Sequence, residues 1–141
     1  IVGFYDDEAC QAQAEELIAM GAARFHGFQS EPRPYYAVAD CVVLASYHEG
    51  MSNVLLEAAA TGRPVITSDI YGCREAVDEG VTGLLCTVKD ADSLYAQMKK
   101  MALLSRQERE QMGLAGRKKM ERQFDKGMVV EKTIAAVWND G

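Results

Sequence analysis

The sequence predicts an α/β fold in which helices cover both faces of a parallel sheet. Short apolar runs rich in β-branched residues alternate with longer segments of helical periodicity along most of the 141 residues. The short runs lack regularly alternating polar positions, as is typical of strands that are buried on both faces. Glycine or proline marks several boundaries, among them Gly21, Gly62 and Pro64. Together these observations favour a doubly wound parallel sheet.

The first part of the chain is expected to contain two strands with a helix between them. Residues 1–5 and 22–28 are apolar runs that we interpret as strands. Apolar residues recur at helical spacing over residues 10–20, and Gly21 ends this helix. Acids at positions 6–8 suit the positive end of its macrodipole. Residues 29–34 contain two prolines and predict a loop. One helical turn is expected after this loop, over residues 35–39.

The middle of the chain predicts a strand, a loop, a helix and a second strand. Residues 41–45 form a short apolar run, and Pro64 opens another that reaches residue 67. Between these runs, Ser52 or Asn53 is a suitable N-cap for a helix that Gly62 ends. Sheets of this kind bind ligands beyond the carboxyl ends of their strands. The loop over residues 46–52 follows such an end, so we expect a ligand there.

The remaining chain predicts one more strand and further helices. Residues 69–75 are a loop entering a short helix that ends near Gly80, and residues 82–88 predict a strand. Asp90 or Asp92 can cap the next helix, and Ser105 can cap a charged helix that continues to residue 123. Residues 128–138 predict a last helix. We expect about five strands and six helices, in a single domain with an α/β core at residues 1–103 and C-terminal helices at 104–141.

Charge is distributed unevenly along the chain. The net charge is −6, but residues 1–98 hold 5 basic and 15 acidic residues, a balance of −10. Residues 99–141 hold 10 basic and 6 acidic residues, a balance of +4. The acidic body argues against nucleic acid as a partner. The basic C-terminal part suits either an anionic membrane or acidic partner, or a solvated helix face, and the pattern favours the solvated face.

The cysteines and histidines predict neither a disulfide framework nor a metal centre. The four cysteines contain no C-x-x-C pair, and we interpret them as reduced thiols of a cytosolic protein. His26 and His48 are the only histidines, which is too few for a typical ligand cluster. No apolar run approaches the roughly 18–20 residues of a membrane span, and no signal peptide is recognisable.

Two acids flank the start of the central helix. Glu49 and Glu57 are eight positions apart, and Gly50 between them lets the backbone approach a ligand closely. The free amides of a helix start suit a phosphate. Glu57 is expected about 6–8 Å along the helix, where its carboxylate can accept two hydrogen bonds from a diol such as a ribose. This order of acid, phosphate site and acid matches the sugar, pyrophosphate and ribose of a nucleoside diphosphate sugar.

A simpler interpretation stays open on spacing alone. Acids are frequent near helix starts, where they interact with the macrodipole without binding a ligand. The glycine patterns of dinucleotide-binding and P-loop proteins are absent, which argues against NAD and ATP as ligands. No histidine–acid relay accompanies Ser52, which argues against serine hydrolase chemistry.

The residues around the two acids resemble the E-x7-E motif of retaining GT-B glycosyltransferases of group 1, family 4. Glu49 is followed directly by Gly50, and seven residues separate it from Glu57. The resemblance runs from residue 1 to residue 103. The other segments that carry it are Ile1-Val2-Gly3, Phe25-His26-Gly27, residues 39–46, residues 57–66, Gly72-Cys73-Arg74-Glu75 and residues 80–85.

The resemblance implies that the chain is the donor-binding, C-terminal half of a GT-B fold, a Rossmann-like domain. Glu57 would hold the ribose hydroxyls of a nucleoside diphosphate sugar. Glu49, the candidate catalytic residue, would contact hydroxyls of the donor sugar. Enzymes of this family are usually metal-independent, so no metal or other cofactor is expected.

The resemblance also assigns donor contacts to backbone groups in two segments. One segment would face the donor sugar and the pyrophosphate, and the other would line the base. The residues of the first are Gly50, Met51, Ser52 and Asn53, and those of the second are His26 and Gly27.

The chain departs from the family pattern in what it lacks. The family's Arg and Lys that neutralise the pyrophosphate lie upstream of its second strand, and the N-terminal acceptor domain precedes them. Neither is in this sequence, which begins with Ile1-Val2-Gly3. We therefore expect a piece of a longer enzyme that cannot turn over alone and that works with the N-terminal domain of the same protein. The helix ending at Trp138 resembles the segment that crosses back to that domain.

The leading functional hypothesis is transfer of a sugar from a nucleotide donor to an acceptor hydroxyl, with retention of configuration. By family analogy the complete enzyme would act in polysaccharide or glycolipid assembly, in the cytoplasm or peripherally at the inner face of the membrane. Two alternatives remain: a nucleotide-sugar-binding module without a transfer role, and another GT-B enzyme such as a nucleotide-sugar epimerase.

Overall fold

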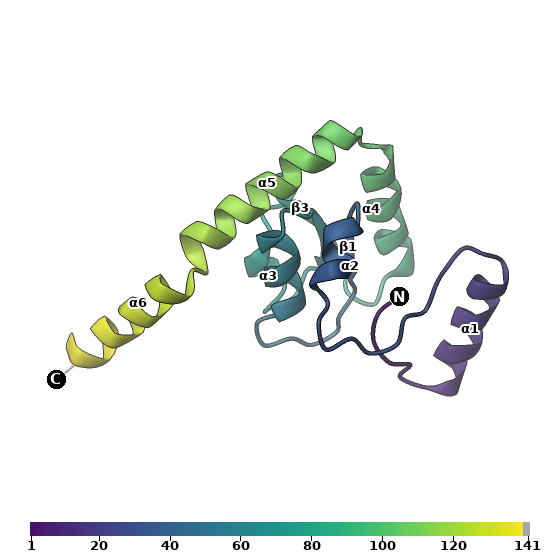
Figure 1. The fold of residues 1–141 in the computed structure, drawn as a ribbon, viewed down its shortest axis with the longest axis horizontal. Helices are drawn as coiled ribbons and strands as arrows, with labels where there is room; N and C mark the ends of the chain where they lie inside the picture. The colour runs from purple at the N-terminus through teal and green to yellow at the C-terminus, as the bar shows by residue number, and fades with distance from the viewer. Residues whose placement is uncertain (140–141) are drawn as a thin grey trace. The chain divides into compact units, whose positions relative to one another are not determined.

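The structure is a computed structural model that describes residues 1–139, with side chains for all of these except 126, 132, 133 and 136–139. Contacts group the chain into two compact units, Ile1–Pro32 and Arg33–Gly141, and each is described by itself (Figure 1). The single domain expected from the sequence stays a prediction.

The first unit contains helix α1, Glu8–Ala19, with two extended segments beside each other. Asp7 is its N-cap and accepts a hydrogen bond from the Cys10 amide at 2.7 Å. This bond lowers the pKa of the Asp7 carboxyl. The helix was expected at this place, and the predicted acids at positions 6–8 lie at its N-terminal end, as the macrodipole favours.

Residues 1–5 and 22–28 do not form the regular strands that the sequence predicts. The His26 amide donates to the Ile1 carbonyl at 2.9 Å, and the Gly3 amide donates to the Gly27 carbonyl at 3.0 Å. In a regular parallel ladder, His26 would both donate to Ile1 and accept from Gly3. Here the Gly27 carbonyl accepts from Gly3 in place of the His26 carbonyl, a shift of one residue. Gly27 has φ +67, which interrupts the extended backbone. Stacked rings of Phe4 and Phe28, 5.2 Å apart, add to this irregular pairing.

The second unit contains a parallel sheet of three strands, β1 (Val42–Leu44), β2 (Val65–Ser68) and β3 (Gly83–Cys86), in the order β1-β2-β3. Val43 pairs with Ile66, which in turn pairs with Leu84. The strands lie where the sequence predicts them. Three regular strands rather than about five therefore occur among residues 1–139.

This unit also contains six helical segments: α2 (Arg33–Val38), α3 (Asn53–Ala60), η1 (Arg74–Ala76), α4 (Ala91–Leu103), α5 (Arg106–Gln123) and α6 (Lys126–Asn139). The expected helix after the loop at residues 69–75 is only one 3₁₀ turn. Of the two predicted caps of α4, Asp90 is the N-cap and accepts from the Ser93 amide at 2.9 Å. The cap of α5 is Ser105, as predicted.

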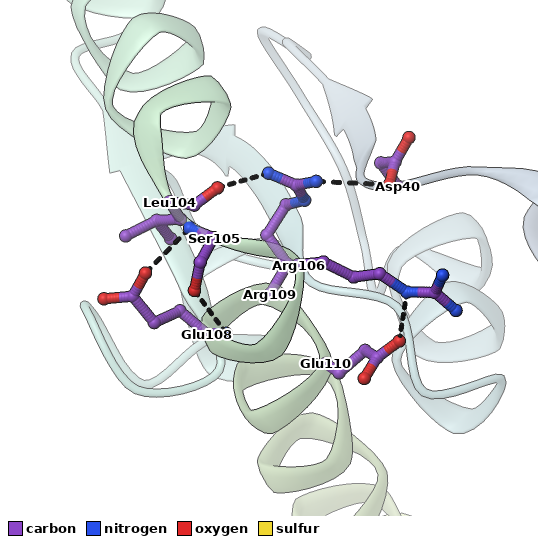
Figure 2. A network of polar contacts seen from close by, with 7 residues as sticks. All are labelled: Asp40, Leu104, Ser105, Arg106, Glu108, Arg109 and Glu110. Atoms are coloured by element: carbon purple, nitrogen blue, oxygen red, sulfur yellow. Dashed lines mark hydrogen bonds and ion pairs between the residues drawn. The ribbon is translucent and has the colours of Figure 1, made fainter.

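Ser105 and Glu108 form a reciprocal capping box at the start of α5 (Figure 2). The Glu108 amide donates to Ser105 Oγ at 3.2 Å, and the Ser105 amide donates to Glu108 Oε2 at 2.7 Å. Beside this cap, the Arg109 guanidinium donates to the Leu104 carbonyl and lies 3.5 Å from Asp40 Oδ1. The start of α5 is thereby fixed to the segment that leads into β1.

Apolar side chains cover both faces of the sheet, as the predicted fold class requires. Val65 and Ile66 are neighbours on β2, so their side chains point to opposite faces. The cluster around Val65 contains Tyr36, Leu55, Ala58, Cys73, Ala76 and Val77. The cluster around Ile66 contains Leu84 and Met101, with Leu94, Leu104, Cys41 and Met112 packed against it. Helices α2 and α3 thus cover one face, and α4 covers the other.

The four cysteines are free thiols, as expected. Cys73 and Cys86 are buried, Cys41 is half-buried and Cys10 is exposed. Burial raises the pKa of the Cys41 thiol to about 12. The thiols inside the fold therefore stay protonated at neutral pH and act as small apolar side chains.

Helix α5 packs against α3 through glycines (Figure 1). Gly113 lies directly against the carbonyl of Gly62, the residue that follows the C-cap of α3. Gly116 faces the Ala59 side chain, and a Cβ there would meet it at an ordinary 3.6 Å. Farther along α5, buried Lys119 donates to Asp78 at 2.6 Å. Helix α5 is held by close backbone approach and by the ion pairs of Arg109 with Asp40 and of Lys119 with Asp78.

Replacing the two helical glycines by alanine should have opposite effects. Alanine gains about 0.8–1 kcal/mol of helix propensity at either position. A Cβ at Gly113 would overlap the Gly62 carbonyl, and such overpacking costs about 1–3 kcal/mol. Gly113→Ala should therefore lower the free energy of unfolding in urea, whereas Gly116→Ala should leave it unchanged or raise it. Equal effects of the two substitutions would contradict the packing described.

Candidate functional site

The candidate site lies at the carboxyl edge of the sheet in the second unit. The three strands are parallel, so the loops over residues 45–52, 69–73 and 87–90 all leave from this edge. In open α/β sheets this edge is where ligands bind. The predicted acids Glu49 and Glu57 belong to the first of these loops and to the helix that follows it.

The loop after β1 is fixed by the loop after β2. The Ser52 amide donates to the Gly72 carbonyl at 3.1 Å. Gly72 has φ +82, and a Cβ on it would overlap the carbonyl oxygens of Gly50 and Glu49. Only glycine fits this contact without strain. Glu75 accepts from the Gly72 amide at 2.8 Å and holds the glycine from its other side.

Glu49 is half-buried, and a hydroxyl group holds one of its carboxylate oxygens. Ser46 Oγ donates to Glu49 Oε1 at 2.6 Å. Just before Ser46, the Leu44 carbonyl accepts from Thr67 Oγ1 at 2.7 Å, which ties the end of β1 to β2. Burial raises the pKa of the neighbouring Cys73 thiol, and the negative charge of Glu49 contributes to the rise. The Cys73 thiol is therefore neutral at neutral pH.

The start of α3 presents backbone amides that its cap side chain does not occupy. Ser52 is the N-cap, one of the two residues that the sequence suggested, but its hydroxyl makes no cap hydrogen bond. Its side chain is buried at 2 % exposure. Asn53, the first residue of α3, is exposed, as are Gly50 and Met51. The amides of a first helical turn have no acceptor within the helix, so they can receive an anion.

Glu57 is exposed on the second turn of α3, and a buried tyrosine contacts it. Tyr36 OH, from α2, donates to Glu57 Oε2 at 3.3 Å. Burial raises the pKa of Tyr36, and the charge of Glu57 raises it further. The phenol therefore keeps its proton at neutral pH and acts as the donor.

The structure thus brings together six of the eight predicted site residues. Glu49, Gly50, Met51, Ser52, Asn53 and Glu57 follow one another along one loop and one helix. His26 and Gly27 belong to the first unit. There the His26 amide donates to Ile1, and its carbonyl accepts from Gln29 Nε2 at 2.7 Å. The role assigned to each of the eight residues stays a prediction.

Sequence reasoning missed two residues that contact the predicted acids. Ser46 lies three positions before Glu49, and this short spacing on a loop was the signal that could have suggested the contact. Tyr36 lies 21 positions before Glu57, and nothing local in the sequence indicates that the two meet. Gly72 was noted only as part of a motif, and the reason for a glycine there is the three-dimensional contact with Gly50.

Cations and aromatic rings pair on the loops around the acids. Lys89, after β3, lies over the ring of Tyr47 at 5.4 Å from its centroid. Arg74 lies over the ring of Tyr71 at 5.6 Å and pairs with Asp69 at 3.1 Å. Arg74 therefore has partners on its own loop.

Two kinds of feature do not occur among the residues that the structure describes. Within residues 1–139, no group of three or more His, Cys, Asp or Glu side chains is arranged to hold a metal ion. In the same part of the chain, no helix is both long enough and apolar enough to cross a membrane.

Comparison with known proteins decides the family. The model of the family "Glycosyl transferases group 1" matches residues 1–103. The chain belongs to this family. Residues 1–103 are the same range over which the motifs resemble it, and they contain both acids.

Two curated relatives are glycosyltransferases of bacteria. A lipopolysaccharide core biosynthesis glycosyltransferase, LpsE of Rhizobium meliloti, is 37% identical over 79 residues, which are 56% of this chain and 23% of that protein. A second relative is the N,N'-diacetylbacillosaminyl-diphospho-undecaprenol α-1,3-N-acetylgalactosaminyltransferase of Campylobacter jejuni. It is 30% identical over 129 residues, which are 91% of this chain and 34% of that protein. The chain thus spans about a third or less of the curated relatives it matches.

Solved structures share the fold. Anabaena HepE in complex with UDP matches with a TM-score of 0.81 at 22% identity, covering 99% of this chain and 40% of that one. WaaG, a glycosyltransferase of lipopolysaccharide biosynthesis, matches with a TM-score of 0.73 at 24% identity, covering 86% of this chain and 33% of that one. These likenesses confirm the predicted α/β fold of the GT-B type.

Alanine at Gly72 should displace the loop that carries Glu49. Left-handed backbone costs an alanine about 1–2 kcal/mol, and overlap with the Gly50 carbonyl adds about 1–3 kcal/mol. Gly80 is the matched control because its φ of +73 is similar but nothing lies within 4 Å of a Cβ there. Gly72→Ala should lower the free energy of unfolding in urea more than Gly80→Ala does, and it should shift the amide NMR signals of residues 49–53. Unchanged signals in that variant would contradict the described docking of the loop.

Proposed function

We propose that the chain is the donor-binding part of a retaining glycosyltransferase that moves a sugar from a nucleoside diphosphate to an acceptor hydroxyl. The observation that carries the proposal is the arrangement of Glu49 and Glu57 around the exposed start of α3, at the carboxyl edge of the sheet. Anabaena HepE, which has the same fold, was solved in complex with UDP and with UDP-glucose. That ligand class supports the proposal for this chain.

The pyrophosphate of the donor binds at the start of α3 in this proposal. The amides of Gly50, Met51 and Asn53 supply hydrogen-bond donors, and the helix macrodipole adds partial positive charge. The Ser52 amide is already bonded to the Gly72 carbonyl. The same groups stabilise the nucleoside diphosphate as it departs, because negative charge grows on its terminal phosphate during transfer. No side-chain cap competes for these amides, since the Ser52 hydroxyl does not bond to them.

The two acids bind the hydroxyl groups at either end of the pyrophosphate. Glu57 lies about 6–8 Å along α3 from its start, a spacing that suits a ribose whose 5′ oxygen carries the phosphate. Glu49 contacts hydroxyls of the donor sugar and is the candidate catalytic residue. Its half-buried carboxylate is fixed by Ser46, as a group that orients a reacting sugar should be. The base-lining role of His26 and Gly27 rests on the family resemblance alone.

Phosphate binding requires no metal in this proposal, because helix amides rather than a cation receive the phosphates. The remaining charge of the pyrophosphate would be neutralised by the Arg and Lys that the family carries upstream of this region. An N-terminal acceptor domain of the same protein would supply the other half of the cleft, and association with a membrane surface would bring it to a lipid acceptor.

Titration with UDP, GDP and ADP, followed by amide NMR shifts, tests the nucleotide site. At least one nucleotide should shift the signals of residues 50–53, with weak affinity, a dissociation constant of about 1 mM. Glu57→Gln should weaken binding about tenfold, because it removes a charge-assisted hydrogen bond to the ribose. Glu121→Gln is the control, since Glu121 is exposed and pairs with Arg117 on α5. The proposal fails if none of the three nucleotides shifts these signals at millimolar concentration.

Transfer assays test the remaining parts of the proposal. The 141-residue chain alone should release or transfer no sugar from UDP-glucose, GDP-mannose or ADP-glucose, because the acceptor half of the cleft is not in it. Addition of EDTA should not change the nucleotide affinity measured by NMR. Measurable transfer by the chain alone, or loss of nucleotide binding in EDTA, would contradict these statements.

A further inference from the structure

We propose that Ser46 and Tyr36 are positioning residues, each of which holds one carboxylate oxygen of one site acid so that the other oxygen faces the donor. Ser46 holds Glu49, and Tyr36 holds Glu57. The inference rests on the proposed function and assigns residues that act through the acids rather than on the ligand itself.

The contact between Ser46 and Glu49 is a strong one. The 2.6 Å between Ser46 Oγ and Glu49 Oε1 is typical of a hydroxyl that donates to an ionised carboxylate. Ser46 is itself fixed in place, since it follows β1 by two residues and the strand end is bonded to Thr67 at 2.7 Å. A serine has one proton to donate. It therefore occupies Oε1 and leaves Oε2 of Glu49 for a sugar hydroxyl.

The contact between Tyr36 and Glu57 is weaker but joins two separate helices. The 3.3 Å between Tyr36 OH and Glu57 Oε2 exceeds the usual length for hydroxyl donors. The Tyr36 ring is 7 % exposed and packs in the same cluster as Leu55 and Ala58 of α3. The ring is enclosed by packing whereas Glu57 is exposed, so the hydroxyl offers a hydrogen-bond donor from the buried cluster to a surface side chain. Oε1 of Glu57 remains available to the ribose.

Holding an acid in its binding geometry matters because a long exposed side chain loses rotamer freedom when it binds. A glutamate that is already held pays less of this entropy on binding. Removing either hydroxyl should weaken the corresponding ligand contact about threefold to tenfold. The effect should be confined to the contact made by the acid that has lost its support.

Two variants of the 141-residue chain, each lacking one hydroxyl group, test the two positioning roles separately. The variants are Ser46→Ala and Tyr36→Phe, and the ligands are UDP, 2′-deoxy-UDP and UDP-glucose. Tyr36→Phe should weaken UDP and reduce the preference for UDP over 2′-deoxy-UDP. Ser46→Ala should leave that preference intact and reduce the extra affinity of UDP-glucose over UDP. If GDP or ADP is the nucleotide that binds in the titration, its matching deoxy and sugar forms replace the uridine series.

Matched variants separate positioning from general loss of structure. Ser46→Thr keeps a hydroxyl and should retain the preference for the sugar nucleotide. In a Glu57→Gln background, Tyr36→Phe should cause no further loss of UDP affinity. Thermal unfolding of each variant is measured separately, because a merely structural role would change stability without changing the ratio of two ligand affinities.

The outcomes distinguish failure of the inference from failure of the proposed function. If Glu49→Gln and Glu57→Gln change ligand affinity but the two hydroxyl deletions leave both preferences unchanged, the positioning roles are wrong and the donor site stands. An equal loss for all three ligands in both deletions would also overturn the positioning roles. If neither glutamine variant affects any ligand, the donor site is wrong and the positioning roles fall with it.

Discussion

The direct backbone contact between the loop after β1 and the loop after β2 is the constraint on which the candidate site depends. Gly72 lies against the carbonyl oxygens of Glu49 and Gly50, and its own carbonyl accepts from the Ser52 amide. This contact determines where α3 begins, and so where its first-turn amides and Glu57 lie. A side chain at position 72 would separate the two loops. The close packing of two loops therefore sets the spacing between the two acids.

Around this contact, the structure supplies hydrogen-bond donors to each acid but few cations. Ser46 and Tyr36 donate to Glu49 and Glu57. The nearby Arg74 already pairs with Asp69 and the ring of Tyr71. Hydroxyl donors keep each carboxylate in one geometry, which suits recognition of sugar and ribose hydroxyls. In the proposed site the phosphates between the acids would rely on backbone amides, which is why we expect weak nucleotide binding by these residues alone.

Much of the fold follows from local sequence patterns, and the exceptions have physical reasons. The three strands of the second unit and the caps Asp90 and Ser105 follow from apolar runs and short polar side chains. The segments at residues 1–5 and 22–28 have strand-like composition, but a shift of one residue at Gly27 prevents a regular ladder. The acids were predictable because they flank one helix start. The partner Tyr36 was not, because its contact to Glu57 depends on how two helices pack.

A crystal structure of this chain grown with UDP is the most direct test of the central claim that Glu57 and the start of α3 form a nucleotide site. The claim predicts ribose hydroxyls within hydrogen-bond distance of the Glu57 carboxylate, and phosphate oxygens at the amides between Gly50 and Asn53. Nucleotide bound elsewhere, with Glu57 facing solvent, would contradict it.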